Sequence, residues 1–405
     1  MHSKLDQVAT KRDSSLFASD IDAFRGVIKD QIEGRRILVL GGAGSIGSAT
    51  LRQLLKFPCD TIHVVDQNEN QLAELVRDLD STAATRTLSD FRTLPLNINS
   101  PAFQRLLSDE LPYDVVLNFA ALKHVRSEKD PYSLLQMIQT NVLAPVQLLR
   151  FLAECGRTNR YFSVSTDKAA NPVNLMGATK RAMEHAIFSE EVLPADELCR
   201  TSARFANVAF SNGSLLESFG KRLEKRQPLA APRDTRRFFV SQEEAGQICL
   251  LAAFAAPAQH ILFPLLSSET DLHRLDQIAM QFLEYHGYEP AIYDCEEDAR
   301  QGLEADLSRK RYPLLLTPLD TAGEKSFEEF LSDDEQQINV GMSALAAIPY
   351  RPAPGGRLTN FITRVNELML DQGTPLSKNQ IIAEFRELVP EFHHNNKTRS
   401  LDSRM

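Results

Sequence analysis

A glycine-rich turn constrains the fold of this chain more than any other part of its sequence. Residues 41–47 read Gly-Gly-Ala-Gly-Ser-Ile-Gly, and they join the apolar segment 36–40 to a segment with helical periodicity at 46–56. Glycine allows a tight turn, and it lets the backbone amides at a helix N-terminus come close to a phosphate. A strand, this turn and a helix in that order predict the first βαβ unit of a dinucleotide-binding sheet.

Short apolar segments and amphipathic segments alternate through the rest of the first half of the chain. We expect strands at residues 36–40, 61–65, 94–98, 113–119 and 160–165, and helices at residues 46–56, 70–79, 102–107, 131–155 and 177–188. Such alternation is typical of an α/β protein with a Rossmann-type, doubly wound parallel sheet.

A carboxylate at the end of the second expected strand indicates which dinucleotide binds. Asp66 follows the strand at residues 61–65 and lies 19 residues after Gly47. A carboxylate there suits the free 2′-hydroxyl of NAD and would repel a 2′-phosphate, so NAD is predicted over NADP. The small residues Ala120 and Ala121 end the fourth expected strand, where the chain usually runs beneath the cofactor.

The pattern divides the chain into four regions. We expect an N-terminal helical extension at residues 1–34, an NAD-binding Rossmann domain at 35–200, a smaller α/β substrate-binding region at 201–335 that is interleaved with the Rossmann core, and a C-terminal helical extension at 336–405. Outside the Rossmann domain we expect a strand at residues 201–205 and helices at 16–32, 242–255, 272–286, 358–370 and 378–388.

Composition argues against several classes of protein. The chain has 405 residues and a net charge of -9, so no broad basic surface for nucleic acid is implied. Its five cysteines are scattered, and they predict neither a disulfide framework nor a metal site. The longest apolar run, residues 248–258, is too short to cross a bilayer, and the polar N-terminus lacks a signal-peptide core. We expect a cytoplasmic homo-oligomer with reduced thiols and no metal.

Three strings in the middle of the chain form a distinctive set: residues 119–125 (Phe-Ala-Ala-Leu-Lys-His-Val), 165–172 (Ser-Thr-Asp-Lys-Ala-Ala-Asn-Pro) and 176–181 (Met-Gly-Ala-Thr-Lys-Arg). Together with residues 204–208 and 235–238, they resemble the extended short-chain dehydrogenases, and more narrowly the nucleotide-sugar 4,6-dehydratases of polysaccharide biosynthesis. Residues 317–330 and 390–405 are similar to the dehydratase of legionaminic acid biosynthesis. The resemblance implies UDP- or GDP-linked N-acetylglucosamine as substrate and its 4-keto-6-deoxy derivative as product.

One residue departs from the general dehydrogenase pattern. Those enzymes normally carry a tyrosine one helical turn before the active-site lysine, whose ammonium lowers the phenol pKa so that the phenolate can take a proton. This chain has Met176 four residues before Lys180, and a thioether cannot carry a proton. The acid/base chemistry has therefore been lost or has moved to Asp167 and Lys168. In the resembled family, methionine here accompanies retention of configuration at C5.

The resemblance also implies a role for each active-site residue. Lys168 would remove the C5 proton and Asp167 would protonate the departing C6 hydroxyl, although attraction between these neighbours opposes both roles unless their side chains point apart. Thr166 would hydrogen-bond the C4 oxygen, and Lys180 would hold the nicotinamide ribose. The acceptor of the O4 proton stays open between Asp167 and a water near Lys180 or Thr166.

The expected binding residues complete the candidate site. The cofactor is expected to contact Gly41, Gly44, Ser45, Ile46, Gly47, Asp66, Asn97, Ile98, Ala120, Ala121 and Lys180, and the substrate to contact Lys123, His124, Asn207 and Arg236.

Two alternatives remain beside the dehydratase. A nucleotide-sugar 4-epimerase or dehydrogenase is disfavoured by Met176, because those enzymes need the tyrosine at O4. A catalytically silent NAD-binding protein is disfavoured by the presence of Asp167, Lys168 and Lys180.

Overall fold

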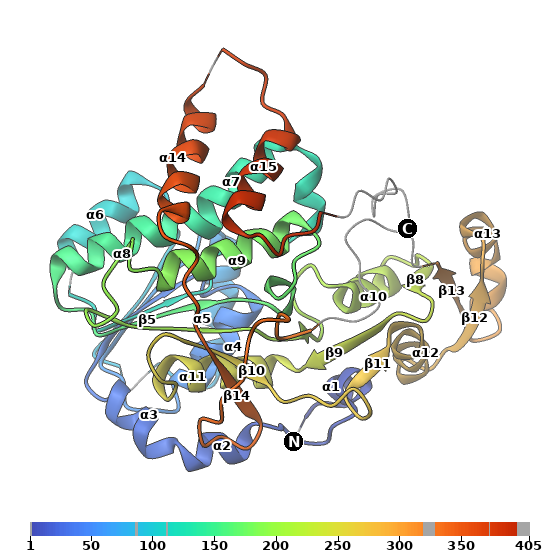
Figure 1. The fold of residues 1–405 in the computed structure, drawn as a ribbon. Coiled ribbons are helices and arrows are strands. Elements are labelled where there is room, and N and C mark those ends of the chain that lie inside the picture. Colours follow the sequence, from blue (N-terminus) through green and yellow to red (C-terminus); the bar gives the residue numbers. More distant parts are fainter. Residues whose placement is uncertain (1, 86–87, 111, 319–328, 372, 395–405) are drawn as a thin grey trace.

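The main body of the protein is an eight-stranded sheet covered by helices on both faces (Figure 1). The computed structural model describes residues 2–394, with gaps at residues 86–87, 111, 319–328 and 372. The strand order is β14-β10-β6-β5-β4-β1-β2-β3, and only the edge strand β14 runs antiparallel to its neighbour. The predicted doubly wound α/β fold is therefore confirmed.

The central strands are buried because helices cover both of their faces, and most of them are rich in apolar residues, although β6 carries buried polar side chains. They are β1 (Arg36–Leu40), β2 (Thr61–Val65), β4 (Val115–Asn118), β5 (Arg160–Val164), β6 (Cys199–Ala203) and β10 (His260–Pro264), with β3 (Asp90–Leu94) and β14 (Leu345–Pro349) at the edges. In the ladder Leu40 pairs with both Val65 and Asn118, so these strands end at one level. The residues that follow them therefore meet at one edge of the sheet.

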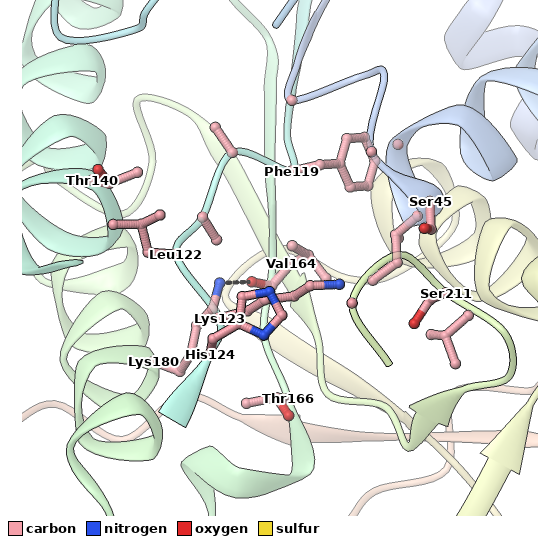
Figure 2. Close-up of a pocket in the computed structure, with 18 of the residues that line it drawn as sticks. Ser45, Phe119, Leu122, Lys123, His124, Thr140, Val164, Thr166, Lys180 and Ser211 are labelled. Carbon is pink, nitrogen blue, oxygen red and sulfur yellow. Dashed lines mark hydrogen bonds between the residues drawn. The ribbon is translucent and has the colours of Figure 1, made fainter. Parts of the chain in front are cut away.

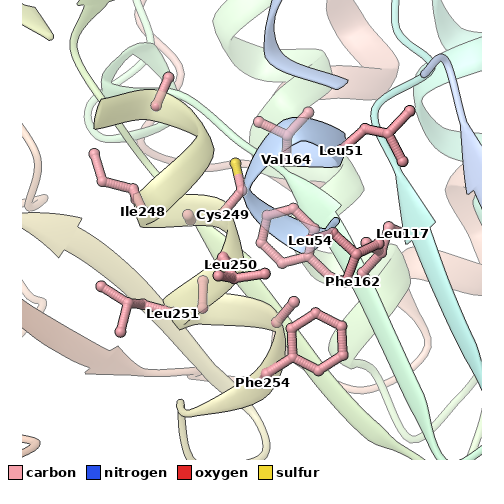
Figure 3. Close-up of a cluster of buried hydrophobic side chains, with 14 of the residues drawn as sticks. Leu51, Leu54, Leu117, Phe162, Val164, Ile248, Cys249, Leu250, Leu251 and Phe254 are labelled. Atoms are coloured by element: carbon pink, nitrogen blue, oxygen red, sulfur yellow. The ribbon is translucent and has the colours of Figure 1, made fainter. Parts of the chain in front are cut away.

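One face of the sheet is covered by the helices α2 (Ala18–Ala23), α3 (Arg25–Ile32), α4 (Ser45–Leu54), α5 (Glu69–Ser81) and α11 (Gln242–Phe254). Helix α11 is buried along almost its whole length and packs against α4 (Figure 3). A Cβ atom at Gly246 would lie 2.5 Å from the main-chain oxygen of Ala49, so this glycine sets the close approach of the two helices.

The other face carries α6 (Pro101–Glu110), α7 (Pro131–Ile138), α8 (Ala144–Cys155) and α9 (Leu175–Phe188). Helix α9 is buried on every side, because α14 (Arg357–Leu370) and α15 (Lys378–Leu388) pack over it from the C-terminal part of the chain (Figure 1). A membrane-crossing helix is absent from the described part of the chain, where no helix is both long and apolar enough.

A smaller unit beside the main sheet contains two three-stranded sheets. One consists of β7 (Asn207–Val208), β9 (Arg236–Val240) and β11 (Leu272–Arg274), and the other of β8 (Leu229–Pro232), β12 (Glu289–Tyr293) and β13 (Arg311–Thr317). Its helices are α1 (Lys4–Thr10), α10 (Leu215–Glu224), α12 (Leu275–Tyr285) and α13 (Glu296–Leu307).

Several elements differ from the sequence expectation for identifiable reasons. The third strand is Asp90–Leu94 and ends before Pro95, which has no N–H for a sheet ladder. The helix expected at 131–155 is interrupted by a π-helical turn at Gln139–Leu143, because Pro145 cannot donate to the carbonyl of Asn141.

Three further expectations also need correction. The helix expected at residues 16–32 breaks at Phe24 into α2 and α3. Residues 272–274, expected in a helix, form β11 against β9. The region from residue 336, expected to be helical, also contributes β14 to the main sheet.

The two ends of the sheet region are tied together by Asp20. Its carboxylate accepts hydrogen bonds from the backbone N–H of Ser343 at 2.6 Å and of Ala344 at 2.9 Å, directly before β14. The N-terminal helices and the last strand are thereby joined.

Candidate active site

A cavity of about 580 Å³ opens at the carboxyl ends of the central strands. Every residue that the sequence assigned to the cofactor lines it, namely Gly41, Gly44, Ser45, Ile46, Gly47, Asp66, Asn97, Ile98, Ala120, Ala121 and Lys180. Ligands of open α/β sheets bind at this edge. The cavity is therefore the candidate active site.

The glycine turn leaves room for a ligand and for the strand beside it. Gly41 has a φ of +69°, and a Cβ there would lie 2.5 Å from the backbone nitrogen of Ala120. A Cβ at Gly47 would lie 2.5 Å from the main-chain oxygen of Gly41. Both positions therefore require glycine, and the turn brings the N-terminus of α4 against the cavity. This geometry fits a pyrophosphate.

Asp66 is held beside this turn by two backbone hydrogen bonds. Its Oδ2 accepts from the N–H of Ala43 at 3.1 Å, and its Oδ1 accepts from the N–H of Asn68 at 2.9 Å. The carboxylate is thus fixed at the rim of the cavity, where it can accept hydrogen bonds from the hydroxyls of a ribose. A dinucleotide with a free 2′-hydroxyl fits these residues.

Lys180 reaches into the other end of the cavity. Figure 2 shows it beside Lys123, His124 and Thr166, with a hydrogen bond from Nζ to the main-chain oxygen of Val164 at 2.9 Å. Burial lowers the pKa of Lys180 to about 8; the nearby Glu184 opposes this shift and Lys123 adds to it. Met176 lines the same wall, and its thioether leaves no proton-carrying group there.

The side chains of Asp167 and Lys168 do not point apart, so the attraction that opposes their implied roles is present. Lys168 Nζ lies 3.0 Å from Asp167 Oδ1, and the Thr166 hydroxyl donates to the same oxygen at 2.8 Å. Thr166 and Lys168 line the cavity, whereas Asp167 is buried behind them and does not. The other carboxylate oxygen, Oδ2, is buried and has no hydrogen-bond partner among the residues that the structure describes.

The expected substrate residues are only partly brought together. Lys123, His124 and Asn207 line the cavity, and Lys123 Nζ donates to the main-chain oxygen of Asn212 at 2.9 Å. Desolvation lowers the pKa of Lys123, and the nearby carboxylate of Glu217 only partly opposes this shift. Arg236 is exposed at the start of β9 and is not among the residues that line the cavity, so the structure does not bring it to the site. Lysines around the cavity favour an anionic ligand.

Sequence reasoning missed two side chains that hold the Lys123 segment in place. Asn141 accepts from the N–H of Leu122 at 2.9 Å and donates to its oxygen at 2.8 Å. Glu128 is buried and accepts from the N–H of Met176 at 2.8 Å, and burial raises the pKa of its carboxyl. Asn141 and Leu122 are 19 positions apart in the sequence, and Glu128 and Met176 are 48 positions apart. No local spacing could have indicated them.

Comparison with known proteins identifies a family. The family model described as "Polysaccharide biosynthesis protein" matches residues 37–349. An uncharacterized membrane protein from Methanocaldococcus jannaschii is 30% identical over 310 residues, which cover 76% of this chain and 84% of that protein. The UDP-N-acetylglucosamine 4,6-dehydratase (inverting) of Campylobacter jejuni is 29% identical over 54% of this chain and 63% of the enzyme.

Other relatives are much longer than the matched region. The probable polysaccharide biosynthesis protein EpsC of Bacillus subtilis is 27% identical over 76% of this chain, but the match spans only 47% of that protein. The match therefore leaves about half of that relative without a counterpart in this chain.

Solved structures share the fold. Pen from Bacillus thuringiensis superposes with a TM-score of 0.61 at 21% identity, over 78% of this chain and 87% of that chain. A UDP-glucuronic acid 4-epimerase from Bacillus cereus, solved with UDP-glucuronic acid and NAD, has a TM-score of 0.52 at 16% identity, over 88% of this chain and 100% of that chain. At these identities the likeness concerns the fold alone.

Proposed function

Because the chain belongs to the polysaccharide biosynthesis protein family, we propose that it is an NAD-dependent 4,6-dehydratase of UDP- or GDP-linked N-acetylglucosamine. One observation carries the proposal. Thr166, Lys168 and Lys180 line the cavity that also contains the glycine turn and Asp66, with Asp167 directly behind them and Met176 where a tyrosine would act. The reaction would give the 4-keto-6-deoxy sugar nucleotide and water.

The cofactor is proposed to bind along the glycine turn. Gly41, Gly44 and Gly47 would receive its pyrophosphate, and Asp66 the hydroxyls of the adenosine ribose. When bound, NAD supplies the hydride chemistry, taking a hydride from C4 of the sugar and later returning one to C6. The 4-epimerase of the same fold, solved with NAD, supports this assignment.

The O4 proton needs an acceptor, and Thr166 with Asp167 can provide one. Because the Thr166 hydroxyl donates to Asp167 Oδ1 at 2.8 Å, its oxygen keeps lone pairs for the sugar hydroxyl. The O4 proton would move to Thr166 as the Thr166 proton moves to Asp167. Asp167 would then carry this proton, and Thr166 would pass it to the C6 hydroxyl, which leaves as water, as Thr166 regains a proton from Asp167. This route uses the same carboxyl first as base and then as acid.

Lys168 is proposed to remove the proton from C5 after the C4 ketone has formed. The ketone makes this proton acidic, and the same ammonium can return it to C5 when hydride reaches C6. Lys168 Nζ lies 3.0 Å from Asp167 Oδ1, and its side chain is 23% exposed. To act as the base, Lys168 would first release its own proton to solvent, and protonation of Asp167 by the O4 proton would remove the attraction that opposes this loss.

Lys180 and Lys123 are proposed to bind and orient the cofactor and the substrate. Lys180 would hold the nicotinamide ribose and contribute positive potential near O4, and Lys123 would face the diphosphate with His124 and Asn207. We assign Arg236 no contact with the substrate, because it does not line the cavity. With Met176 at the tyrosine position, we propose retention of configuration at C5.

The legionaminic acid assignment is a proposal that depends on residues 317–330 and 390–405. Residues 323–325 and 401–405, which carry some of that resemblance, lie outside the described residues. We propose this pathway from the sequence resemblance alone.

Turnover in deuterated water tests the function. The protein is incubated with NAD and either UDP- or GDP-N-acetylglucosamine, and the product is read by NMR. A 4-keto-6-deoxy product with deuterium at C5 and the original configuration is expected. A 4-epimer without deuterium at C5 would indicate an epimerase instead, and no turnover of either substrate would reject the proposal. Lys168→Ala should abolish turnover, whereas the exposed Lys225→Ala should not.

A further inference from the structure

The C-terminal part of the chain contacts the segment that carries the proposed catalytic residues. Helices α14 and α15 lie over α9 (Figure 1), and residues on either side of them enter the protein interior. Besides this apolar packing, the contact includes a group of charged side chains that we call the ion cluster: Arg181, Glu184, Arg204, Glu335 and Glu391.

Arg204 is the centre of the ion cluster and is completely buried. It binds both oxygens of Glu184, with Nε to Oε1 at 2.8 Å and Nη2 to Oε2 at 2.7 Å. It also binds both oxygens of Glu335, with Nη1 to Oε2 at 2.6 Å and Nη2 to Oε1 at 2.9 Å. Two carboxylates from distant parts of the chain therefore share one guanidinium.

Arg181 extends the cluster to the end of the described chain. From its place on α9 it donates to Glu184 at 3.1 Å, to Glu335 at 2.7 Å and to Glu391 at 2.8 Å. Although burial opposes it, Arg204 and Arg181 hold the pKa of Glu335 well below its usual range. Glu335 is therefore charged at any pH at which the protein would be assayed.

The ion cluster reaches the proposed active site through Ser165. The Ser165 hydroxyl donates to Glu184 Oε1 at 2.6 Å, and its backbone N–H donates to Ala203 at 2.8 Å. Ser165 lines the cavity and directly precedes Thr166. A second link lies further along the same segment, where the N–H of His393 donates to the oxygen of Pro172 at 3.0 Å.

We propose that Glu335 and Glu391 are positioning residues of the active site, through which the C-terminal segment holds residues 165–172 in their reactive arrangement. The inference rests on the proposed function for its catalytic readout. Glu335 acts through Arg204, Glu184 and Ser165, and Glu391 acts through Arg181.

Charge balance explains why the carboxylates matter beyond stability. If Glu335 were replaced by the neutral glutamine, the buried guanidiniums of Arg181 and Arg204 would depend on Glu184 and on Glu391, which is partly exposed. Breaking one partner out of a buried ion network leaves uncompensated charge. Glu184 would then be drawn toward the arginines and away from the Ser165 hydroxyl, which would loosen the segment that carries Thr166, Asp167 and Lys168.

The test compares Glu335→Gln and Glu391→Gln with the matched variant Glu384→Gln. Glu384 also lies in the C-terminal segment and pairs with Arg364 on α14, away from the ion cluster. A small displacement of reacting groups can cost about 100-fold in rate. We expect kcat to fall about 10- to 100-fold in Glu335→Gln and about 3- to 10-fold in Glu391→Gln, with KM and the Kd for NAD little changed and Glu384→Gln like wild type.

Hydrogen exchange provides a readout that does not depend on turnover. Peptides covering residues 165–174 should exchange faster in Glu335→Gln and Glu391→Gln than in wild type, while peptides of the glycine turn at 41–47 should not. Because Glu391 is partly exposed, we expect Glu391→Gln to fold. Unchanged kcat together with unchanged exchange in this variant would overturn the inference. Equal loss of NAD affinity and kcat would also overturn it, because that indicates general unfolding. If wild type turns over neither sugar nucleotide, the proposed function fails, and the exchange data still decide the inference.

Discussion

The hydroxyl of Thr166 donates a 2.8 Å hydrogen bond to the carboxylate of Asp167, which is itself buried out of the cavity. In the proposed mechanism, Asp167 would therefore exchange a proton with a ligand hydroxyl through Thr166. Thr166→Val keeps the side-chain shape but breaks this route, and we expect C4 oxidation to slow by about 100-fold or more. Thr166→Ser keeps the hydroxyl and should lose much less. Absorbance of the reduced cofactor in a single turnover measures the step, and equal rates in the two variants would contradict the relay.

Lys180 should give the reaction an alkaline limit near pH 8. Its pKa is lowered to about 8 by burial, so the ammonium that is proposed to act near O4 is lost as the pH rises through that value. Lys123→Met removes a like charge and should move the limit of kcat to higher pH, whereas Glu184→Gln removes an opposite charge and should move it lower. The same limit in both variants would exclude Lys180 as its origin.

The alkaline loss of rate should not come from unfolding. Between pH 8 and the usual lysine value of 10.5, the unfolded chain holds a proton on this residue that the folded chain has lost. Stability contributed by Lys180 therefore rises with pH across this window. Urea unfolding at both ends of the window checks the sign.

Asp66 should determine the choice of dinucleotide. Asp66→Asn removes a charged acceptor for the ribose hydroxyls, and hydrogen bonds to charged groups contribute about 1.5 to 3 kcal/mol, so the Kd for NAD should rise roughly 10-fold or more. The variant should also discriminate less against NADP, because the repulsion of its 2′-phosphate is gone. Asp78→Asn, in an exposed ion pair with Arg52 on the nearby helices, is the control. Calorimetric titration with both dinucleotides measures the ratio, and an unchanged ratio would contradict the assignment.

Two glycines should respond in opposite ways to alanine. A Cβ at Gly47 meets the oxygen of Gly41 at 2.5 Å, so Gly47→Ala should cost about 1 to 3 kcal/mol of stability and weaken NAD binding. Gly26, inside α3, has no atom within 4 Å of its added Cβ. Gly26→Ala should therefore leave binding unchanged and stabilise the protein by up to about 1 kcal/mol. Urea unfolding of both variants makes the comparison, and a stable Gly47→Ala protein with normal NAD affinity would count against the tight turn.

Strongly apolar elements could be predicted from the sequence, and half-buried ones could not. Strand β2 lies at Thr61–Val65 as expected, because all five residues are buried and none of them is glycine or proline. Strand β3 was expected at residues 94–98 but lies at Asp90–Leu94. Its residues are only partly buried, so their pattern is weak, whereas the apolar residues around Pro95 resemble a strand. Edge strands carry a weak pattern for this reason.

The candidate site was predictable where one local segment supplies the group. The glycine turn precedes helix α4 and Asp66 follows strand β2 in the same βαβ unit, and the structure brings both to the cavity. The contact between Asp167 and Lys168 depends on side-chain rotamers that spacing does not determine. The hydrogen bond from Arg204 to Glu335 joins residues that are 131 positions apart, so only the folded chain brings them together.

Strand β14 has a consequence for the order in which the protein can be completed. It covers the outer edge of β10 and is itself held by Asp20, so the first helices and the last strand close the sheet together. A growing polypeptide that has not yet reached residue 349 leaves β10, with Ile261, Leu262 and Phe263, as an open edge. Such edges pair readily with other chains. During synthesis on the ribosome the protein therefore passes through a long interval in which this edge is unprotected, and the interval ends only when the C-terminal part has emerged.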